Sequence, residues 1–119
     1  MQGTRSYISP EQLRGQAVDA RADVYSFACT LFELVAGKPP YTGASAQELL
    51  QKHLAGPTPS LAAANRNVTP EFADLVRRAM AKDRATRPAS VGELLRKLRG
   101  MRIFKCDLPP PTQVAFPVT

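Results

Sequence analysis

The segment from residue 19 to residue 36 constrains the fold of this sequence more than any other. Its apolar residues recur at the spacing of an α-helix. They are Val24, Phe27, Ala28, Leu31, Leu34 and Val35. Cys29 and Phe32 widen this stripe, and a helix that is apolar on most faces is buried nearly all round. Gly37 suits the position after a helix, and Pro39-Pro40 stops any continuation. We therefore expect the rest of the chain to pack around this helix.

Four further helix starts are marked by residues that cap helix N-termini. Ser9, Ser45, Thr69 and Ser90 are of the types whose side-chain oxygen accepts a hydrogen bond from the first turn. After Ser9 and Thr69 a proline occupies the first helical position, which its ring geometry favours. The predicted helices are a short one from 10 that ends near Gly15, one at 46–55, one from 70 whose apolar stripe reaches Met80, and one at 91–99.

The remaining pattern favours helices without strands. Leu49, Leu50 and Leu54 share one side of the 46–55 helix, and the inward residues of the last helix are Val91, Leu94, Leu95 and Leu98. Residues 57–69 contain proline and polar residues and are predicted to be a loop. No segment alternates between apolar and polar residues at period two. The sequence thus predicts an all-α fold of about five helices with no sheet.

The positive charge is concentrated in one part of the chain. The net charge is +6, from 16 basic and 10 acidic residues. Ten of the sixteen lie between positions 77 and 105: Arg77, Arg78, Lys82, Arg84, Arg87, Arg96, Lys97, Arg99, Arg102 and Lys105. Such a cluster can bind nucleic acid or an acidic membrane, or can be the solvated face of helices. We favour the solvated face and expect no nucleic-acid partner, because Phe104 is the only aromatic residue for base stacking that is interleaved among these charges.

Composition excludes several further classes of protein. The length of 119 residues fits one domain. No apolar run approaches the roughly 20 residues of a membrane span, and we expect no signal peptide at the start. Two cysteines are too few for a disulfide scaffold or a zinc site, so we expect a reducing, cytoplasmic location. Cys29 is interpreted as a core residue, Cys106 as a tail thiol, and His53 as a helix-face residue with no partner pattern.

Four stretches, taken in order, resemble the C-terminal lobe of Ser/Thr protein kinases. Residues 3–12 resemble the end of the activation segment, with Ser9-Pro10-Glu11 in place of the usual Ala-Pro-Glu. Residues 19–27 resemble the start of the central helix of that lobe, and residues 34–41 resemble its exit. Lys82-Asp83 followed by Arg87-Pro88 resembles the connector before the last helix. In their detailed residues these motifs are similar to those of the bacterial eukaryotic-like (Hanks-type) kinases. The resemblance covers about residues 3–100.

The resemblance implies roles for five residues. Thr4 would bond the catalytic aspartate and lysine, and the loop from Thr4 to Tyr7 would form the wall beside the substrate residue that follows the phosphoacceptor. Glu11 would form a buried ion pair with Arg87, and Asp23 would hold the backbone of the catalytic loop. Two positions depart from the family pattern, since Ala28 stands where glycine is usual and Arg84 where proline is frequent.

The residues themselves leave alternatives to these roles. Glu11 has no cation nearby in the sequence, so a buried carboxylate there would need a remote partner. Without the resemblance, Thr4 is an ordinary turn threonine and Arg87 a surface arginine. Asp23 either faces solvent near a helix end or accepts hydrogen bonds in a buried position, and the resemblance favours the second reading.

The sequence lacks the parts of a kinase that carry out phosphoryl transfer. These are a Gly-rich loop, a strand lysine paired with a helix glutamate, a catalytic-loop aspartate and asparagine, and the metal-binding aspartate of Asp-Phe-Gly. We therefore expect no catalytic, cofactor-binding or metal-binding residue in this chain. Mg-ATP would be bound by the complete parent domain.

These observations predict a division of the chain and a function. Residues 1–18 would be the end of the activation segment and a short helix, 19–105 a helical remnant of the kinase C-lobe, and 106–119 a Pro-rich tail or linker. We expect a partial Ser/Thr kinase domain, inactive alone, that contributes substrate docking and scaffold. Its partners would be a protein substrate or the missing N-terminal half of the kinase. The alternative is a stand-alone, non-catalytic helical interaction module.

Overall fold

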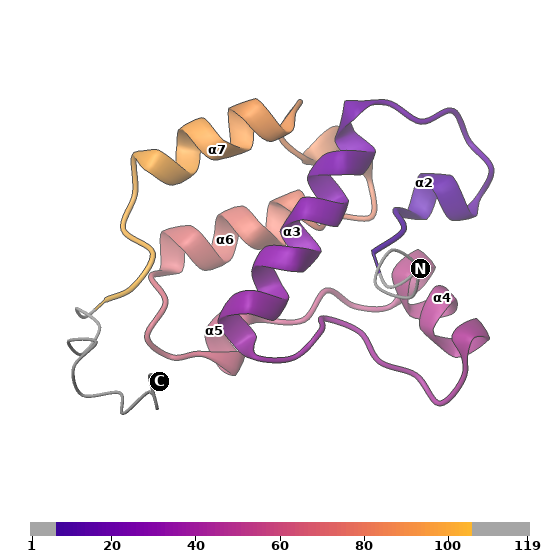
Figure 1. Cartoon of the computed structure of the whole chain (residues 1–119), viewed down its shortest axis with the longest axis horizontal. Coiled ribbons are helices and arrows are strands. Elements are labelled where there is room, and N and C mark those ends of the chain that lie inside the picture. Colours follow the sequence, from indigo (N-terminus) through magenta and orange to yellow (C-terminus); the bar gives the residue numbers. More distant parts are fainter. Residues whose placement is uncertain (1–6, 106–119) are drawn as a thin grey trace, which may run out of the picture.

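The computed structural model describes residues 7–105, which fold into helices joined by turns and loops (Figure 1). The helices are α2 (Pro10–Leu13), α3 (Ala20–Ala36), α4 (Ala46–Ala55), α5 (Leu61–Ala64), α6 (Pro70–Ala79), the 3₁₀-helix η1 (Arg84–Thr86) and α7 (Val91–Arg99). These residues form no sheet, and one isolated antiparallel bridge joins Val68 to Phe104. The all-α prediction is therefore confirmed. Thr4 and the predicted tail at 106–119 lie outside the described residues.

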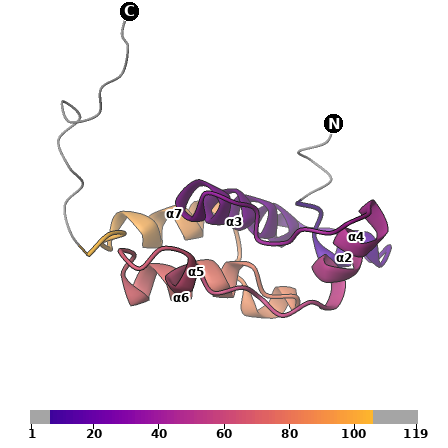
Figure 2. The ribbon, with the colours of Figure 1, turned by 90° about the horizontal axis from the view of Figure 1, so that it is seen from below.

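Helix α3 is the element around which the others are arranged. It contacts α5, α6 and α7, and Figure 1 shows it crossing α6 and α7 at a steep angle. Seen from below, α3 and α7 lie on one side and α5 and α6 on the other (Figure 2). Helices α2 and α4 contact each other at one end of the molecule.

The hydrophobic core lies between α3, α6 and α7. Its fully buried members include Tyr25, Phe32, Phe72, Leu75 and Leu94. Full burial of a side chain of this size stabilises the fold by about 1.5–3 kcal/mol relative to leaving it exposed. Tyr7 and Phe104, near the two limits of the described chain, pack against the same cluster. One core therefore connects the described chain from its beginning to its end.

The predicted capping residues begin the helices in the structure. The side chains of Ser9, Ser45, Thr69 and Ser90 each accept a hydrogen bond from a backbone N–H in the first turn. Gly37 ends α3 with a φ of 79°, a left-handed conformation that glycine adopts without strain. The predicted boundaries of the 46–55 and 91–99 helices are confirmed.

The loop prediction for residues 57–69 was incomplete. Residues 57–69 include the four-residue helix α5, whose N-terminus is capped by Ser60. Leu61 of this helix is buried against α6, which is a contact that a local pattern cannot indicate.

No helix among residues 7–105 has both the length and the apolar character to cross a membrane.

The predicted burial was wrong at three apolar or aromatic positions. Leu34 was placed in the buried stripe of α3 but is 75% exposed, and Leu95 was placed inward but is 36% exposed. Leu34 is thus largely open to solvent, whereas Leu95 is only partly covered. His53, which was interpreted as a helix-face residue without a partner, is only 1% exposed and bonds to Tyr25. It occupies the buried face of α4, where the nearby leucines are only half-buried.

Candidate functional site

The most developed polar contact in the structure is the ion pair between Glu11 of α2 and Arg87, which follows η1. The Arg87 guanidinium donates from Nη1 to Oε2 of Glu11 at 2.7 Å and from Nη2 to Oε1 at 2.8 Å. Such a bidentate pair is the strongest geometry for an arginine and a carboxylate. Glu11 is 2% exposed and Arg87 is 5% exposed. The two residues are thus buried together, and each supplies the counter-charge that the other needs.

Arg87 also binds three backbone carbonyls. It donates from Nε to the carbonyl of Ala81 at 2.8 Å and from Nη1 to that of Arg21 at 2.8 Å. A longer hydrogen bond, of 3.4 Å, joins Nη2 to the carbonyl of Lys82. The guanidinium lies 5.0 Å from the centre of the Tyr25 ring. Through these contacts one side chain joins α2, the first turn of α3 and the connector between α6 and α7.

The contacts with Arg87 lower the pKa of Glu11. Burial alone would raise the pKa of the Glu11 carboxyl. Hydrogen bonds and charge attraction, chiefly from Arg87, together outweigh burial, and the pKa falls below its ordinary value of 4.5. Glu11 is therefore ionised at neutral pH.

The other residues named from the sequence do not join this pair. Tyr7 is half-buried, and its carbonyl accepts a 2.6 Å hydrogen bond from Oγ of Ser26 on α3. Asp23 lies exposed in the first turn of α3 and makes no hydrogen bond or ion pair within residues 7–105. In this structure the Asp23 carboxylate lies near the positive end of the helix dipole, and its role towards a catalytic loop stays a prediction.

Beside the ion pair lies a polar cluster that sequence reasoning missed. The hydroxyl of Tyr25 and Nδ1 of His53 are 2.7 Å apart in the buried interior. The Tyr41 ring packs edge-on against His53, with 4.8 Å between ring centres. Lys82 places its ammonium 4.2 Å from the centre of the Tyr41 ring and donates to the Tyr41 hydroxyl at 2.8 Å. The cluster joins α3, α4 and the connector.

The surroundings of this cluster shift several pKa values. Burial lowers the pKa of Lys82 to about 8, and the positive charge of Arg87 acts in the same direction. Burial raises the pKa of Tyr41 to about 12 and that of the Cys29 thiol to about 12. The predicted core position of Cys29 is confirmed, since its side chain is fully buried.

A sequence signal for His53 did exist. His53 follows Leu49 by four residues, so both lie on the same side of α4. A lone histidine at a position of an apolar stripe indicates burial with a polar partner. The partner, Tyr25, is 28 positions away, and only the tertiary structure identifies it.

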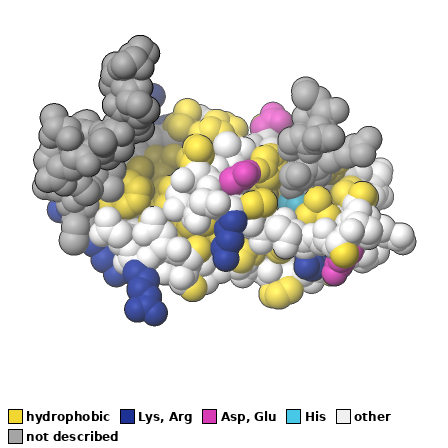
Figure 3. Space-filling model, turned by 60° about the horizontal axis from the view of Figure 1, so that its bottom comes forward, with side chains coloured by type: hydrophobic (Ala, Val, Ile, Leu, Met, Phe, Trp, Pro, Cys, Tyr) yellow, Lys and Arg dark blue, Asp and Glu magenta, His cyan; other side chains and the backbone are white. Residues whose placement is uncertain are grey.

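One face of α3 has no complete cover from the described chain. Phe27, Leu31 and Leu34 follow one another at helical spacing; the first two are half-buried and the third is exposed. In the view of Figure 3, hydrophobic side chains gather along the upper part of the surface, between scattered charged groups. This stripe leaves apolar surface that residues 7–105 do not cover completely.

Residues 7–105 contain no group of three or more His, Cys, Asp or Glu side chains that could hold a metal ion. The kinase motifs that bind nucleotide and metal are also absent from the sequence.

Comparison with known proteins finds matches to a single family and to members of that family. Residues 1–98 match the family described as the protein kinase domain. The probable serine/threonine-protein kinase PknB of Bifidobacterium longum is 41% identical over 91 residues, which cover 76% of this chain and 13% of that protein. The serine/threonine-protein kinase PknB of Mycolicibacterium smegmatis is 39% identical over 92 residues, covering 77% and 15%. The chain thus spans less than a sixth of the length of these relatives.

The fold comparison agrees. The twitchin kinase region from C. elegans superimposes with a TM-score of 0.71 at 22% sequence identity. The match covers 81% of this chain and 17% of that one. At this level of identity the match concerns the fold.

Proposed function

The chain belongs to the protein kinase family, and from this premise we propose that it is the C-terminal part of a Ser/Thr kinase domain. The complete domain would transfer the γ-phosphate of Mg-ATP to serine or threonine of a protein. This chain would supply the scaffold and substrate docking and would be inactive alone. A cytoplasmic location fits an ATP-dependent activity and the free thiol of Cys29.

The observation that carries this proposal is the Glu11–Arg87 pair. It joins the stretch that resembles the end of a kinase activation segment to the connector that resembles the one before the last C-lobe helix. Loss of one partner of such a buried pair strongly destabilises the folded protein. It would hold the substrate-facing loop in place on the helical scaffold.

The proposed roles of the remaining residues follow from this arrangement. Thr4 and Tyr7 would position the substrate, and the hydrogen bond from Ser26 to the Tyr7 carbonyl supports this by fixing the loop on α3. Asp23 would bind the backbone of a catalytic loop supplied by the other half of the domain. Its exposure in this chain leaves its carboxylate accessible to such a partner.

The partly uncovered face of α3 supports a partner that completes the domain. Phe27, Leu31 and Leu34 present apolar surface on the same helix as Asp23. The N-terminal half of a kinase domain would cover this face. Without it, we expect the chain to bind a hydrophobic dye.

Complementation tests this proposal. The chain is mixed with the part of the M. smegmatis relative that precedes the matched region, and phosphate transfer from radiolabelled ATP to a general acceptor protein is measured. We expect no transfer by either part alone and measurable transfer by the mixture. Transfer by this chain alone would contradict the proposal, as would a folded chain that neither binds the other part nor restores transfer.

Two leucines offer a matched pair of variants for this experiment. Leu34→Glu places a charge on the uncovered face of α3, whereas Leu95→Glu places one on α7, where the leucine is also exposed. Both variants should fold, since neither side chain is in the core. We expect Leu34→Glu to abolish complementation and Leu95→Glu to retain it.

A further inference from the structure

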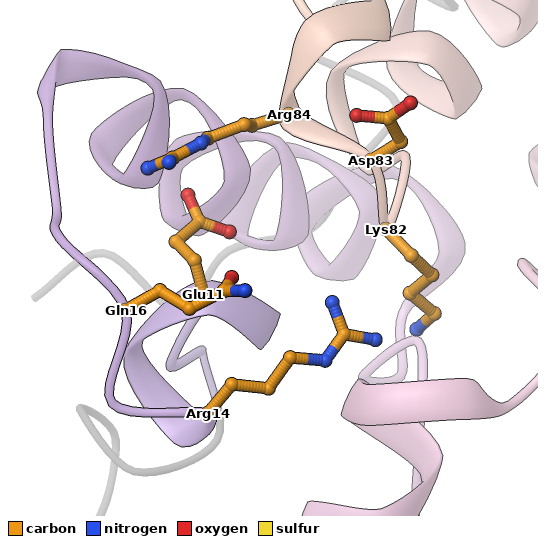
Figure 4. A pocket seen from close by; sticks show the side chains of 6 residues that line it. All are labelled: Glu11, Arg14, Gln16, Lys82, Asp83 and Arg84. Atoms are coloured by element: carbon orange, nitrogen blue, oxygen red, sulfur yellow. The ribbon is translucent and has the colours of Figure 1, made fainter.

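A polar pocket of about 430 Å³ lies beside the Glu11–Arg87 pair (Figure 4). It opens between the C-terminal end of α2 and the connector that precedes η1. The residues that line it are Glu11, Arg14, Gln16, Lys82, Asp83 and Arg84. None of the roles proposed above uses this space.

The pocket carries an excess of positive charge. The negative charge of Glu11 is balanced by Arg87, which donates two hydrogen bonds to its carboxylate. Three cations, those of Arg14, Lys82 and Arg84, then face a single remaining acid, Asp83. The Asp83 side chain caps η1 by accepting from the Ala85 N–H at 3.0 Å, and in Figure 4 its carboxylate points away from Arg14. The local net charge is therefore about +2 at neutral pH.

None of the three cations takes part in an ion pair within residues 7–105. Arg14 donates from Nη2 to the carbonyl of Leu54 at 3.3 Å, and Arg84 donates from Nη1 to the carbonyl of Ala17. A guanidinium has five N–H donors, so each arginine keeps donors for a ligand. These two side chains come from opposite sides of the pocket (Figure 4).

Lys82 adds to this unbalanced charge. Its ammonium donates to the Tyr41 hydroxyl at 2.8 Å and to the Lys52 carbonyl at 2.9 Å, both of which are uncharged acceptors. Burial lowers the pKa of Lys82, and the positive charges of Arg87 and Arg14 lower it further. An anion in the pocket would relieve this repulsion and raise that pKa.

We propose that Arg14, Lys82 and Arg84 form a binding site for a phosphate monoester. Such a group carries a charge of about −1.5 to −2 at pH 7 and three strong acceptor oxygens. It would balance the excess charge of the pocket and could accept hydrogen bonds from both guanidinium groups. If each heavy atom of a phosphate group needs less than the volume of one water molecule, the group needs on the order of 100 Å³. The pocket is therefore larger than the space that a single phosphate group fills. The phosphate could thus belong to a phosphothreonine or phosphoserine peptide or to a smaller free phosphate compound.

This site is independent of the proposed function, because binding is measured on this chain without catalysis or a second half. Isothermal titration of the full chain uses three probes at 150 mM salt. They are a short phosphothreonine peptide, the same peptide without phosphate, and inorganic phosphate. A tighter fit of the phosphopeptide than of inorganic phosphate identifies a peptide as the source, and equal affinities identify a free phosphate compound.

Variants with the same change in net charge localise the site. Arg14→Gln and Arg84→Gln each remove one cation from the pocket, and Arg96→Gln removes one from the exposed surface of α7. We expect each pocket variant to weaken phosphate binding at least about tenfold and the α7 variant to leave it unchanged. Circular dichroism checks that every variant keeps its helices. Lys82 is left intact in these variants because its hydrogen bonds also hold α4.

A second readout follows Lys82 directly by NMR. Phosphate binding should raise the pKa of Lys82 from about 8 towards its ordinary value of 10.5. No saturable binding of the phosphorylated peptide or of phosphate to the wild-type chain would overturn the proposal. Equal weakening by Arg14→Gln and Arg96→Gln would also overturn it, because the effect would then come from net charge alone.

Discussion

Glu11 and Arg87 are 76 positions apart in the sequence, yet two hydrogen bonds of 2.7 and 2.8 Å join the carboxylate to the guanidinium. Helix α2 is short, with only four residues, and cannot be stable by itself. The ion pair and the contacts of α2 with α4 hold it against the rest of the molecule. The position of the loop before α2 therefore depends on a side chain near the other end of the described chain.

The free energy of unfolding should depend on both charges of the buried pair. Arg87→Met leaves the buried Glu11 carboxylate without its counter-charge, and we expect a loss of about 3–5 kcal/mol in the free energy of unfolding. Urea denaturation followed by circular dichroism measures this loss. Arg78→Met removes an arginine from the exposed pair with Asp74 and should cost less than about 1 kcal/mol. Equal losses in the two variants would contradict a special role for the buried pair.

The double variant Glu11→Leu with Arg87→Met provides a further check. It removes both buried charges, so no unpaired charge remains in the interior. We expect the double variant to be more stable than Arg87→Met alone. A double variant that is less stable than the single one by the full cost of Glu11→Leu would show that the two residues act independently.

Stability in acid should depend on Glu11. Its pKa is lower in the folded state than the ordinary value of 4.5, so its contribution is fully present above pH 4.5. That contribution is lost as the pH falls through the lower folded value, because the unfolded chain then binds the proton first. We expect the free energy of unfolding of Glu11→Gln to fall less steeply below pH 4.5 than that of the wild type. Parallel curves would show that Glu11 does not contribute; the shared decline comes from other carboxylates, such as Asp74.

The Cys29 thiol should be inert while the chain is folded. It is fully buried, and its pKa is raised to about 12, so almost no thiolate is present at pH 8. In a Cys106→Ser background, Cys29 is the remaining cysteine, and its reaction with a thiol reagent can be followed by absorbance. We expect the reaction to be slow without urea and to accelerate in parallel with unfolding. Rapid reaction of the folded chain would mean that the core around α3 opens readily.

Tyr25→Phe should isolate the contribution of the buried hydrogen bond to His53. The substitution keeps the ring and removes the hydroxyl that lies 2.7 Å from Nδ1. We expect a loss of about 1–3 kcal/mol in the free energy of unfolding, because a buried polar atom loses its partner. Tyr7→Phe is the matched control, since the hydrogen bond of Tyr7 uses its backbone carbonyl, and should change stability by less than about 0.5 kcal/mol. A Tyr25→Phe variant as stable as the control would show that the hydrogen bond contributes little.

The helical elements could be predicted because their signals are local. Ser9, Thr69 and Ser90 mark helix starts through side chains that bond within the same turn, and Gly37 marks an end through its left-handed backbone. Helix α5 escaped prediction because four residues give no periodic pattern. The bridge between Val68 and Phe104 escaped because it joins positions 36 residues apart.

The candidate site was only partly accessible to sequence reasoning. Glu11 indicated a remote cation, but its identity as Arg87 came from resemblance to a family. The same limit applied to His53, whose partner Tyr25 lies on another helix. Leu34 shows the opposite error, because its apolar character fits the stripe of α3 while no described element covers it. Local pattern indicates that a side chain can be buried but not what buries it.

The claim that this chain is the C-terminal part of a kinase domain can be tested most directly in the DNA. The measurement is the nucleotide sequence upstream of the Met1 codon, translated in all three frames. We predict that it encodes a catalytic-loop aspartate and an Asp-Phe-Gly motif just ahead of this chain. A promoter and a ribosome-binding site directly upstream, with no such coding sequence, would contradict that claim and favour a stand-alone interaction module.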